Sequence, residues 1–358
     1  MNKNNINKII ELIQNKHFEE AEIIIIDQLK KKEEASIINL YGIIFLQQGK
    51  FQESIKKFKL AEKYEPNYFK SYNNHGIALY NLKKYSEACK KYTKAIELNP
   101  TFSQAHNNMG VSLNSLKEYN EAIKYFKNSI KLKFDFIDPY INLGNLFLKN
   151  NNSSEAINCF LKATKIKKND PKIIFKLGLA YKNNLKYEAS ISELKLAIKL
   201  DPYFSDAYSA LGTVYIEINK YEDAISCFKK AIDLDPNFSA AYHNLLFAYS
   251  YIENFSNFEY RNYLKKYRNI LNTYQLDCVK YNYVKKPKKI KIGFVSGDFN
   301  NHPVGYFLFD LIKKINKSNF ETYAYSNKYT INDNINLQFK INFNYWREIF
   351  DKSDLETI

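Results

Sequence analysis

The stretch that decides the fold is SDAYSALGTVYIEINKYEDAISCFKKAIDLDP, Ser205–Pro236. Its small residues, Gly212 and Ala224 among them, fall where two helices must approach each other closely. Aromatic residues such as Phe228 supply the bulk that fills the space between those helices. Pro236 lacks a backbone N–H donor and therefore ends the second helix. The stretch predicts two antiparallel helices joined by a short turn.

The unit recurs along the chain. Six of the ten glycines are spaced 34 residues apart and mark position 8 of successive units: Gly42, Gly76, Gly110, Gly144, Gly178 and Gly212. Position 20 is always Ser or Ala, and position 24 is an aromatic residue or leucine in every unit: Phe58, Tyr92, Phe126, Phe160, Leu194 and Phe228. The fourth unit is shifted, because its proline, Pro171, opens the next unit. This pattern resembles tetratricopeptide repeats, in which each unit is a pair of antiparallel helices.

The repeats predict a mostly α protein, a right-handed tetratricopeptide superhelix (an α-solenoid) followed by an incomplete α/β Rossmann-like segment. We expect about seven repeats in residues 1–250, the first of them a degenerate capping unit. Residues 251–288 are expected to be irregular closing helices and a linker. Residues 289–358 are expected to be the N-terminal fragment of a catalytic domain.

Composition excludes several other functions. The formal net charge of +15 suggests nucleic acid, but many of the lysines occupy outward helical positions, for example Lys56, Lys57, Lys90, Lys91, Lys229 and Lys230. No basic run carries the interleaved aromatics and glycines of an RNA-binding motif, so we expect no nucleic-acid partner. No apolar stretch is long enough for a signal peptide or a membrane span. The cysteine spacing suits neither zinc nor a disulfide pair. We therefore expect a cytoplasmic protein without a metal or cofactor.

Asparagines recur at position 6 of the units, on the first helix, which lines the concave face of such superhelices: Asn74, Asn108, Asn142 and Asn244. Asn39, Asn73 and Asn107 add amides at position 5. An amide side chain both donates and accepts hydrogen bonds, so it can hold an extended peptide backbone whatever its side chains. The column is broken at Lys176 and Ala210. Surface asparagine in a chain rich in this residue is the alternative interpretation.

From Lys289 onward the pattern changes. KIKIGFVS predicts a buried parallel strand, GDFNNHP a loop, VGYFLFDLIKKI a helix that Pro303 opens, and FETYAYSN a second strand. In open α/β sheets, ligands bind beyond the carboxyl ends of such strands. His302, in that loop, could therefore be a general base or a phosphate contact. Its position alone favours an ordinary loop histidine. The remaining four histidines fall in the repeats, where we expect them to be structural.

The order of repeats, then AAYHNLLFAYSY, then KIKIGFVSGDFNNHPVGYFLFDLI and FETYAYSN resembles the O-linked N-acetylglucosamine transferases of bacteria and eukaryotes. The resemblance implies a protein O-glycosyltransferase that moves N-acetylglucosamine from UDP-N-acetylglucosamine to Ser or Thr. It implies that the asparagine column holds acceptor peptides. It matches His302 to the family's active-site histidine, and Asp298, Phe299 and Pro303 to the rest of that loop.

The family's second lobe has no counterpart in the sequence. A capping box, Ser353–Glu356, announces a helix, and the last residue is Ile358. These observations lead us to expect a truncated chain that is inactive by itself. The alternative function is a non-catalytic tetratricopeptide scaffold that binds proteins.

Overall fold

The computed structural model describes residues 3–252, 255–273, 289–296, 299, 303–326 and 334–349. The chain divides into two compact units, Met1–Tyr274 and Gln275–Ile358. In the described residues the first unit is helical, and the second combines helices with a sheet. Asp298, His302 and the expected capping box at Ser353–Glu356 lie outside the described residues.

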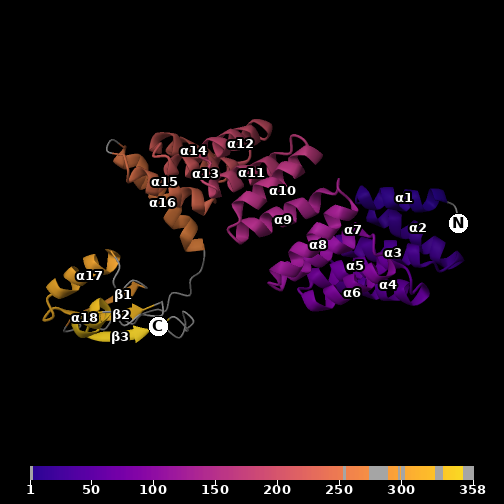
Figure 1. Ribbon diagram of the computed structural model, residues 1–358, viewed down its shortest axis with the longest axis horizontal. Coiled ribbons are helices and arrows are strands. Elements are labelled where there is room, and N and C mark those ends of the chain that lie inside the picture. Colours follow the sequence, from indigo (N-terminus) through magenta and orange to yellow (C-terminus); the bar gives the residue numbers. More distant parts are fainter. Residues whose placement is uncertain are drawn as a thin grey trace. The chain divides into compact units, whose positions relative to one another are not determined.

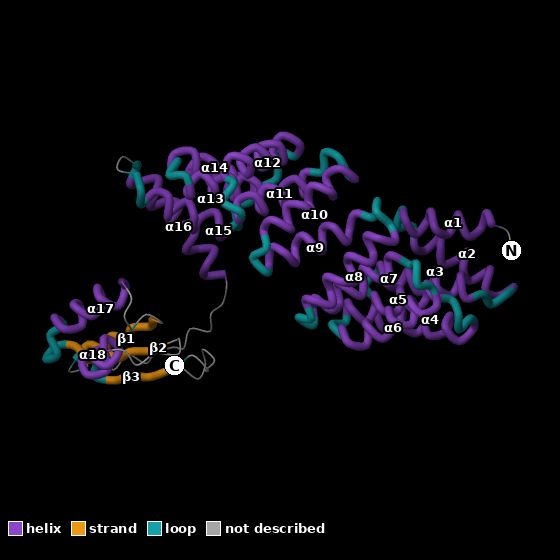
Figure 2. Tube along the Cα trace, in the orientation of Figure 1, coloured by secondary structure: helices purple, strands orange, loops and turns teal. Residues whose placement is uncertain are grey.

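The first unit is a row of antiparallel helix pairs, each packed on the next (Figures 1 and 2). The helices are α1 (Lys3–Gln14), α2 (Phe18–Lys31), α3 (Ala35–Gln47), α4 (Phe51–Tyr64), α5 (Phe69–Asn81), α6 (Tyr85–Leu98), α7 (Ser103–Ser115), α8 (Tyr119–Leu132), α9 (Ile137–Lys149), α10 (Ser153–Ile166), α11 (Pro171–Asn183), α12 (Tyr187–Leu200), α13 (Ser205–Glu217), α14 (Tyr221–Leu234), α15 (Ser239–Tyr249) and α16 (Asn257–Thr273). Residues 35–238, all described, contain no strand. The predicted solenoid of helix pairs is confirmed. Within residues 251–288, which were expected to be irregular closing helices and a linker, the described residues Asn257–Thr273 form one regular helix, α16.

The repeated glycine lets the two helices of each pair approach each other. A Cβ atom built on Gly110 would lie 2.7 Å from a ring carbon of Phe126, and one on Gly212 would lie 2.7 Å from Phe228. Phe126 and Phe228 are themselves almost fully buried. The aromatic ring of the second helix therefore occupies the space that a side chain on the first helix would need. This contact explains why the glycine and the large residue recur together.

The turn inside each pair uses a left-handed residue. Position 15 of each regular unit has a positive φ between 58° and 75°: Gly49, Lys83, Lys117, Asn151, Leu185 and Asn219. Glycine adopts this conformation without strain, whereas a branched residue such as Leu185 does so at a cost. The turn is thus fixed by the packing of the two helices as much as by its own sequence.

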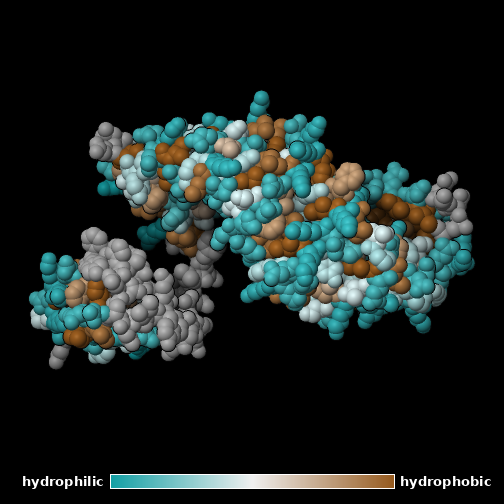
Figure 3. Space-filling model, in the orientation of Figure 1, coloured by the Kyte–Doolittle hydropathy of each residue, from teal (hydrophilic) through white to brown (hydrophobic). Residues whose placement is uncertain are grey.

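The visible surface of the repeats is largely hydrophilic, with hydrophobic side chains showing between the helices (Figure 3). Lys56, Lys90 and Lys230 are exposed, as expected from their helical positions. Others are paired: Lys91 binds Glu62 and Lys229 binds Glu259. Much of the positive charge therefore belongs to a solvated surface that covers an apolar core.

The second unit contains a parallel sheet in the order β1–β2–β3, formed by β1 (Ile290–Ser296), β2 (Phe320–Ser326) and β3 (Tyr345–Glu348). The helices α17 (Pro303–Lys314) and α18 (Asn334–Asn342) connect the strands. One face of the sheet packs into an apolar cluster of Phe299, Ile312, Ala324, Phe339 and Phe343. The two expected strands, their parallel pairing and the helix that Pro303 opens are confirmed; α18 and β3 were not predicted.

The expectation that β1 is buried is wrong. Val295 is 66% exposed, because the described helices cover only the opposite face, which carries Phe294 and Ala324. Ile290, the first residue of the strand, is 58% exposed although it shares a face with Phe294. A continuous apolar run cannot reveal whether one or both faces of its sheet are covered.

Candidate functional site

A column of asparagines joins neighbouring repeats. Asn74 on α5, Asn108 on α7 and Asn142 on α9 occupy the same position of successive units. Each donates a hydrogen bond from Nδ2 to the Oδ1 of an asparagine on the preceding first helix: Asn74 to Asn39 at 2.9 Å, Asn108 to Asn73 at 2.9 Å and Asn142 to Asn107 at 3.0 Å. We call Asn74, Asn108 and Asn142 the asparagine ladder.

The acceptors of these bonds are buried. Asn39, Asn73 and Asn107 are 3–5% exposed. They were expected to add amides to the concave surface, and that expectation is wrong. They lie between adjacent first helices instead. Successive residues of a helix point in different directions, so position 5 faces the neighbouring helix and position 6 faces the open side.

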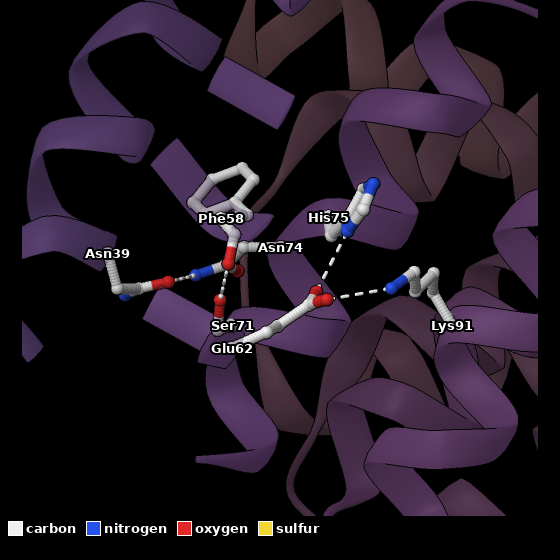
Figure 4. Close-up of polar contacts among 7 residues, drawn as sticks. All are labelled: Asn39, Phe58, Glu62, Ser71, Asn74, His75 and Lys91. Carbon is white, nitrogen blue, oxygen red and sulfur yellow. Dashed lines mark hydrogen bonds and ion pairs between the residues drawn. The ribbon is translucent and has the colours of Figure 1, made fainter. Parts of the chain in front are cut away.

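Two further bonds close the network. Asn107 Nδ2 donates to Asn108 Oδ1 at 3.5 Å, and Asn73 Nδ2 donates to Asn74 Oδ1 at 3.3 Å. Six amides therefore form one unbroken series of donors and acceptors from Asn142 to Asn39. Figure 4 shows its last step, with the side chains of Asn39 and Asn74 pointing toward each other.

The ladder amides keep hydrogen-bonding capacity. A carboxamide has two N–H donors and two acceptor lone pairs. Within the network, Asn74 and Asn108 each use one N–H donor and one acceptor lone pair. Each therefore keeps one N–H donor and one lone pair for a ligand. Their side chains are half-buried, so a ligand can reach them. One free donor beside one free acceptor matches the peptide group of an extended backbone.

Asn244, the fourth asparagine of the column, is half-buried on α15. No hydrogen bond joins it to a neighbouring repeat within residues 3–252. The two units between it and Asn142 carry Lys176 and Ala210 at this position. The geometry of the network thus supports Asn74, Asn108 and Asn142 as one set and leaves Asn244 apart.

A second polar cluster lies where α4, α5 and α6 meet (Figure 4). The Glu62 carboxylate accepts hydrogen bonds from His75 Nδ1 at 2.8 Å and from Lys91 Nζ at 2.7 Å. His75 is 2% exposed. Burial raises the pKa of the Glu62 carboxyl, but the hydrogen bonds from His75 and Lys91 lower it further, so it lies below its ordinary value of 4.5. The cluster ties two repeats together, as expected of a structural histidine.

His106 is also a packing residue. Its Nε2 donates to the carbonyl of Pro100 at 3.0 Å, and its side chain is mostly buried. The expectation that the histidines of the repeats are structural is confirmed for His75 and His106. Glu62 was not singled out from the sequence, since a glutamate on a lysine-rich helix gives no local signal of burial.

In the second unit, Phe299 is a core residue. It is fully buried, its ring lies 5.4 Å from that of Phe339 and 5.2 Å from that of Trp346, and its carbonyl accepts a hydrogen bond from Asn336 Nδ2 at 2.8 Å. Phe299 is therefore held against α18 and β3. In the sequence it follows β1, and in such sheets ligands bind beyond the carboxyl ends of the strands.

Family models match both units. Tetratricopeptide repeat models match residues 69–102, 103–136, 171–204 and 205–238, and a TPR repeat model matches residues 144–184. The model of Glycosyl transferase family 41 matches residues 264–356. Residues 69–136 and 144–238 are thus similar to tetratricopeptide repeats, and residues 264–356 are similar to Glycosyl transferase family 41.

Two solved structures share the repeat fold, and a third matches with a lower TM-score. The C-terminal part of a TPR repeat-containing protein from Cytophaga hutchinsonii is 22% identical, with a TM-score of 0.54 over 67% of this chain and 99% of that chain. The Cut9–Hcn1 hetero-tetramer of the APC/C is 18% identical, with a TM-score of 0.51 over 74% and 52%. An O-GlcNAc transferase mutant from Thermobaculum terrenum is 23% identical, with a TM-score of 0.40 over 62% and 42%. No curated protein matches the chain.

Two kinds of feature are absent from the described residues. No helix there is long and apolar enough to cross a membrane. No group of His, Cys, Asp and Glu side chains there is arranged to hold a metal ion.

Proposed function

We propose that the repeats of this protein hold extended segments of other proteins, and that its family 41 segment serves the transfer of N-acetylglucosamine to Ser or Thr of those segments. The observation that carries the first half is the asparagine ladder, whose half-buried amides keep a free donor beside a free acceptor. The match of residues 264–356 to Glycosyl transferase family 41 carries the second half.

Peptide binding by the ladder follows from hydrogen-bond chemistry. A peptide backbone presents a donor and an acceptor at every residue except proline. The network fixes the ladder amides before a ligand arrives, so little side-chain entropy is lost on binding. Because the amides address the backbone, we expect affinity for many sequences rather than for one motif.

The donor substrate is proposed to be UDP-N-acetylglucosamine. In the transfer, the acceptor hydroxyl oxygen bonds to the anomeric carbon, the bond from that carbon to the diphosphate breaks, and the hydroxyl proton passes to a base. His302, between β1 and α17, is proposed as that base or as a phosphate contact. Asp298, Phe299 and Pro303 are proposed to shape the same loop, with Phe299 as its buried anchor.

The second candidate function is a scaffold that binds proteins without transferring sugar. The described helices leave the face of the sheet that carries Val295 uncovered, and Val295 is 66% exposed. Parallel sheets normally have both faces covered, so this observation favours the scaffold, for which we expect peptide to bind and to stay unlabelled.

One experiment addresses both halves. The pure chain is incubated with radiolabelled UDP-N-acetylglucosamine and a Ser-rich peptide that carries a photo-crosslinker. Crosslinks on α5, α7 and α9 without label in the peptide support a peptide-binding chain that needs further protein for transfer. Sustained labelling that a His302→Ala variant abolishes would show transfer by this chain itself. Crosslinks confined to the second helices of the pairs would contradict peptide binding by the first helices.

A further inference from the structure

Lys176 interrupts the asparagine column with a charge. It lies on α11 at the position held by Asn142 on α9. Its side chain is half-buried, and its Nζ donates to Asn145 Oδ1 at 3.1 Å. Position 5 of the preceding unit, which holds the acceptor asparagine in the ladder repeats, is the partly buried Ile141, so the amide network cannot continue. An ammonium has three donors, and Asn145 takes one of them.

Within residues 3–252, the charge of Lys176 has no counter-charge. It forms no ion pair within residues 3–252, the part of the repeat array described without a gap. Burial lowers the pKa of the Lys176 ammonium, and no carboxylate raises it. α11 itself carries Lys172 and Lys182 and no acidic residue. A half-buried cation without a counter-ion is costly, and a ligand carboxylate that pairs with it relieves that cost.

The spacing of the helices sets where such a carboxylate would lie. α9 and α11 are in contact, and packed helices have axes about 8–10 Å apart. An extended peptide rises about 3.3 Å per residue. The residue opposite Lys176 is therefore about three positions from the one held at Asn142.

We propose that Lys176 is a specificity-determining residue, which selects extended peptides with Asp or Glu about three positions from the residue bound at Asn142. The inference rests on the proposed binding of peptides by the asparagine ladder and adds a preference that the ladder amides cannot express. In the next unit the same position holds Ala210, whose side chain has no polar group that could bind the ligand carboxylate in place of Lys176.

The test uses the full chain and fluorescent peptides of about 15 residues, long enough to reach from Asn74 to Lys176. A neutral peptide of Ser, Thr, Ala and Gly is compared with versions carrying one Glu at successive positions. Dissociation constants are measured by fluorescence anisotropy at low and high salt. The variants are Lys176→Met, Lys176→Glu and, as a control on the same helix, the exposed Lys172→Met.

We expect one Glu position, with its immediate neighbours, to bind about tenfold tighter than the neutral peptide, as for a charge-assisted hydrogen bond in a partly buried site. The gain should disappear in Lys176→Met, persist in Lys172→Met and shrink at high salt. In Lys176→Glu, the same position should instead favour Lys. Melting temperatures of all variants report whether the fold is kept.

The outcomes separate the two proposals. A neutral peptide that binds through the ladder, with no gain from Glu at any position, overturns the role of Lys176 and leaves the ladder intact. A gain that survives Lys176→Met also overturns it. A Glu peptide that binds through Lys176, with an affinity that replacing Asn74, Asn108 and Asn142 by Ala leaves unchanged, supports Lys176 and contradicts the ladder. Binding of no peptide at all contradicts both.

Discussion

Asn108 Nδ2 donates a hydrogen bond to Asn73 Oδ1 at 2.9 Å, across the boundary between two repeats. The first of these amides is half-buried and the second is 4% exposed. The accessible amide is therefore oriented by a buried one in the preceding unit. Their separation of 35 residues is one repeat plus one residue, which is why two adjacent columns of asparagine recur together.

This relationship predicts a positioning role for Asn73. Replacing Asn73 with Leu removes the acceptor that orients Asn108, so peptide affinity should fall toward that of Asn108→Ala. In the double variant the two losses should add only in part, since both act on the hydrogen bond of Asn108 to peptide, while Asn73→Leu also removes the donor to Asn74. Titration of the four proteins with one neutral peptide measures the coupling. Full additivity would mean that Asn73 does not act through Asn108.

The contact between Gly110 and Phe126 predicts a strong coupling in stability. Gly110→Ala places a Cβ where the Phe126 ring lies, and overpacking of this kind costs about 1–3 kcal/mol. In a Phe126→Ala background the same glycine change should cost far less. Urea unfolding followed by circular dichroism gives the four free energies. Equal costs in both backgrounds would show that the glycine is needed for another reason.

The positive φ of Leu185 leads us to predict that a glycine there would stabilise the protein. Its φ is 58° and its side chain is 72% exposed, so it is strained without making compensating contacts. Leu185→Gly should raise the free energy of unfolding by about 0.5–1 kcal/mol. Gly49→Leu, at the same position of another repeat, should lower it by a similar amount. A loss of stability in Leu185→Gly would show that the exposed leucine packs usefully.

Glu62 predicts a loss of stability in acid. Its folded-state pKa lies below the ordinary 4.5, so the stabilisation is fully present above that pH and is lost as the pH falls through the lower value. Glu62→Gln should cost about 1–3 kcal/mol at neutral pH and should flatten the acid limb of the stability profile. Glu97→Gln, which breaks an exposed pair with Lys94, should change little. Identical acid profiles for the wild type and Glu62→Gln would contradict this assignment.

The sequence was sufficient to predict the helix pairs, because a contact within each repeat requires particular residue types at fixed positions. The glycine at position 8 recurs because a Cβ there would meet the residue at position 24 of the same unit. Its 34-residue spacing therefore gives the number of regular helix pairs from the sequence alone. β1 and β2 have seven residues each, rich in apolar and aromatic side chains, which is enough to predict a strand. β3, with four residues, is too short for such a signal.

Other features depend on contacts between distant parts of the chain. Neither the burial of Asn73 nor the exposure of Asn108 follows from composition, because only the packing of α5 against α7 distinguishes positions 5 and 6. The exposure of Val295 depends on which face of the sheet the helices cover. Phe299, expected as one residue of a loop, became a core residue through contacts with α18 and β3.

The most direct test of the account is the affinity of the ladder variant for peptide. Isothermal titration compares the wild type with the triple variant Asn74→Ala, Asn108→Ala and Asn142→Ala. A double variant, Asn128→Ala and Asn158→Ala, changes exposed asparagines on the second helices as a control. Each ladder hydrogen bond contributes about 0.5–1.5 kcal/mol, so the triple variant should bind at least about tenfold more weakly, and the control should bind as the wild type does. An unchanged dissociation constant in a folded triple variant would contradict the ladder as the peptide-binding site.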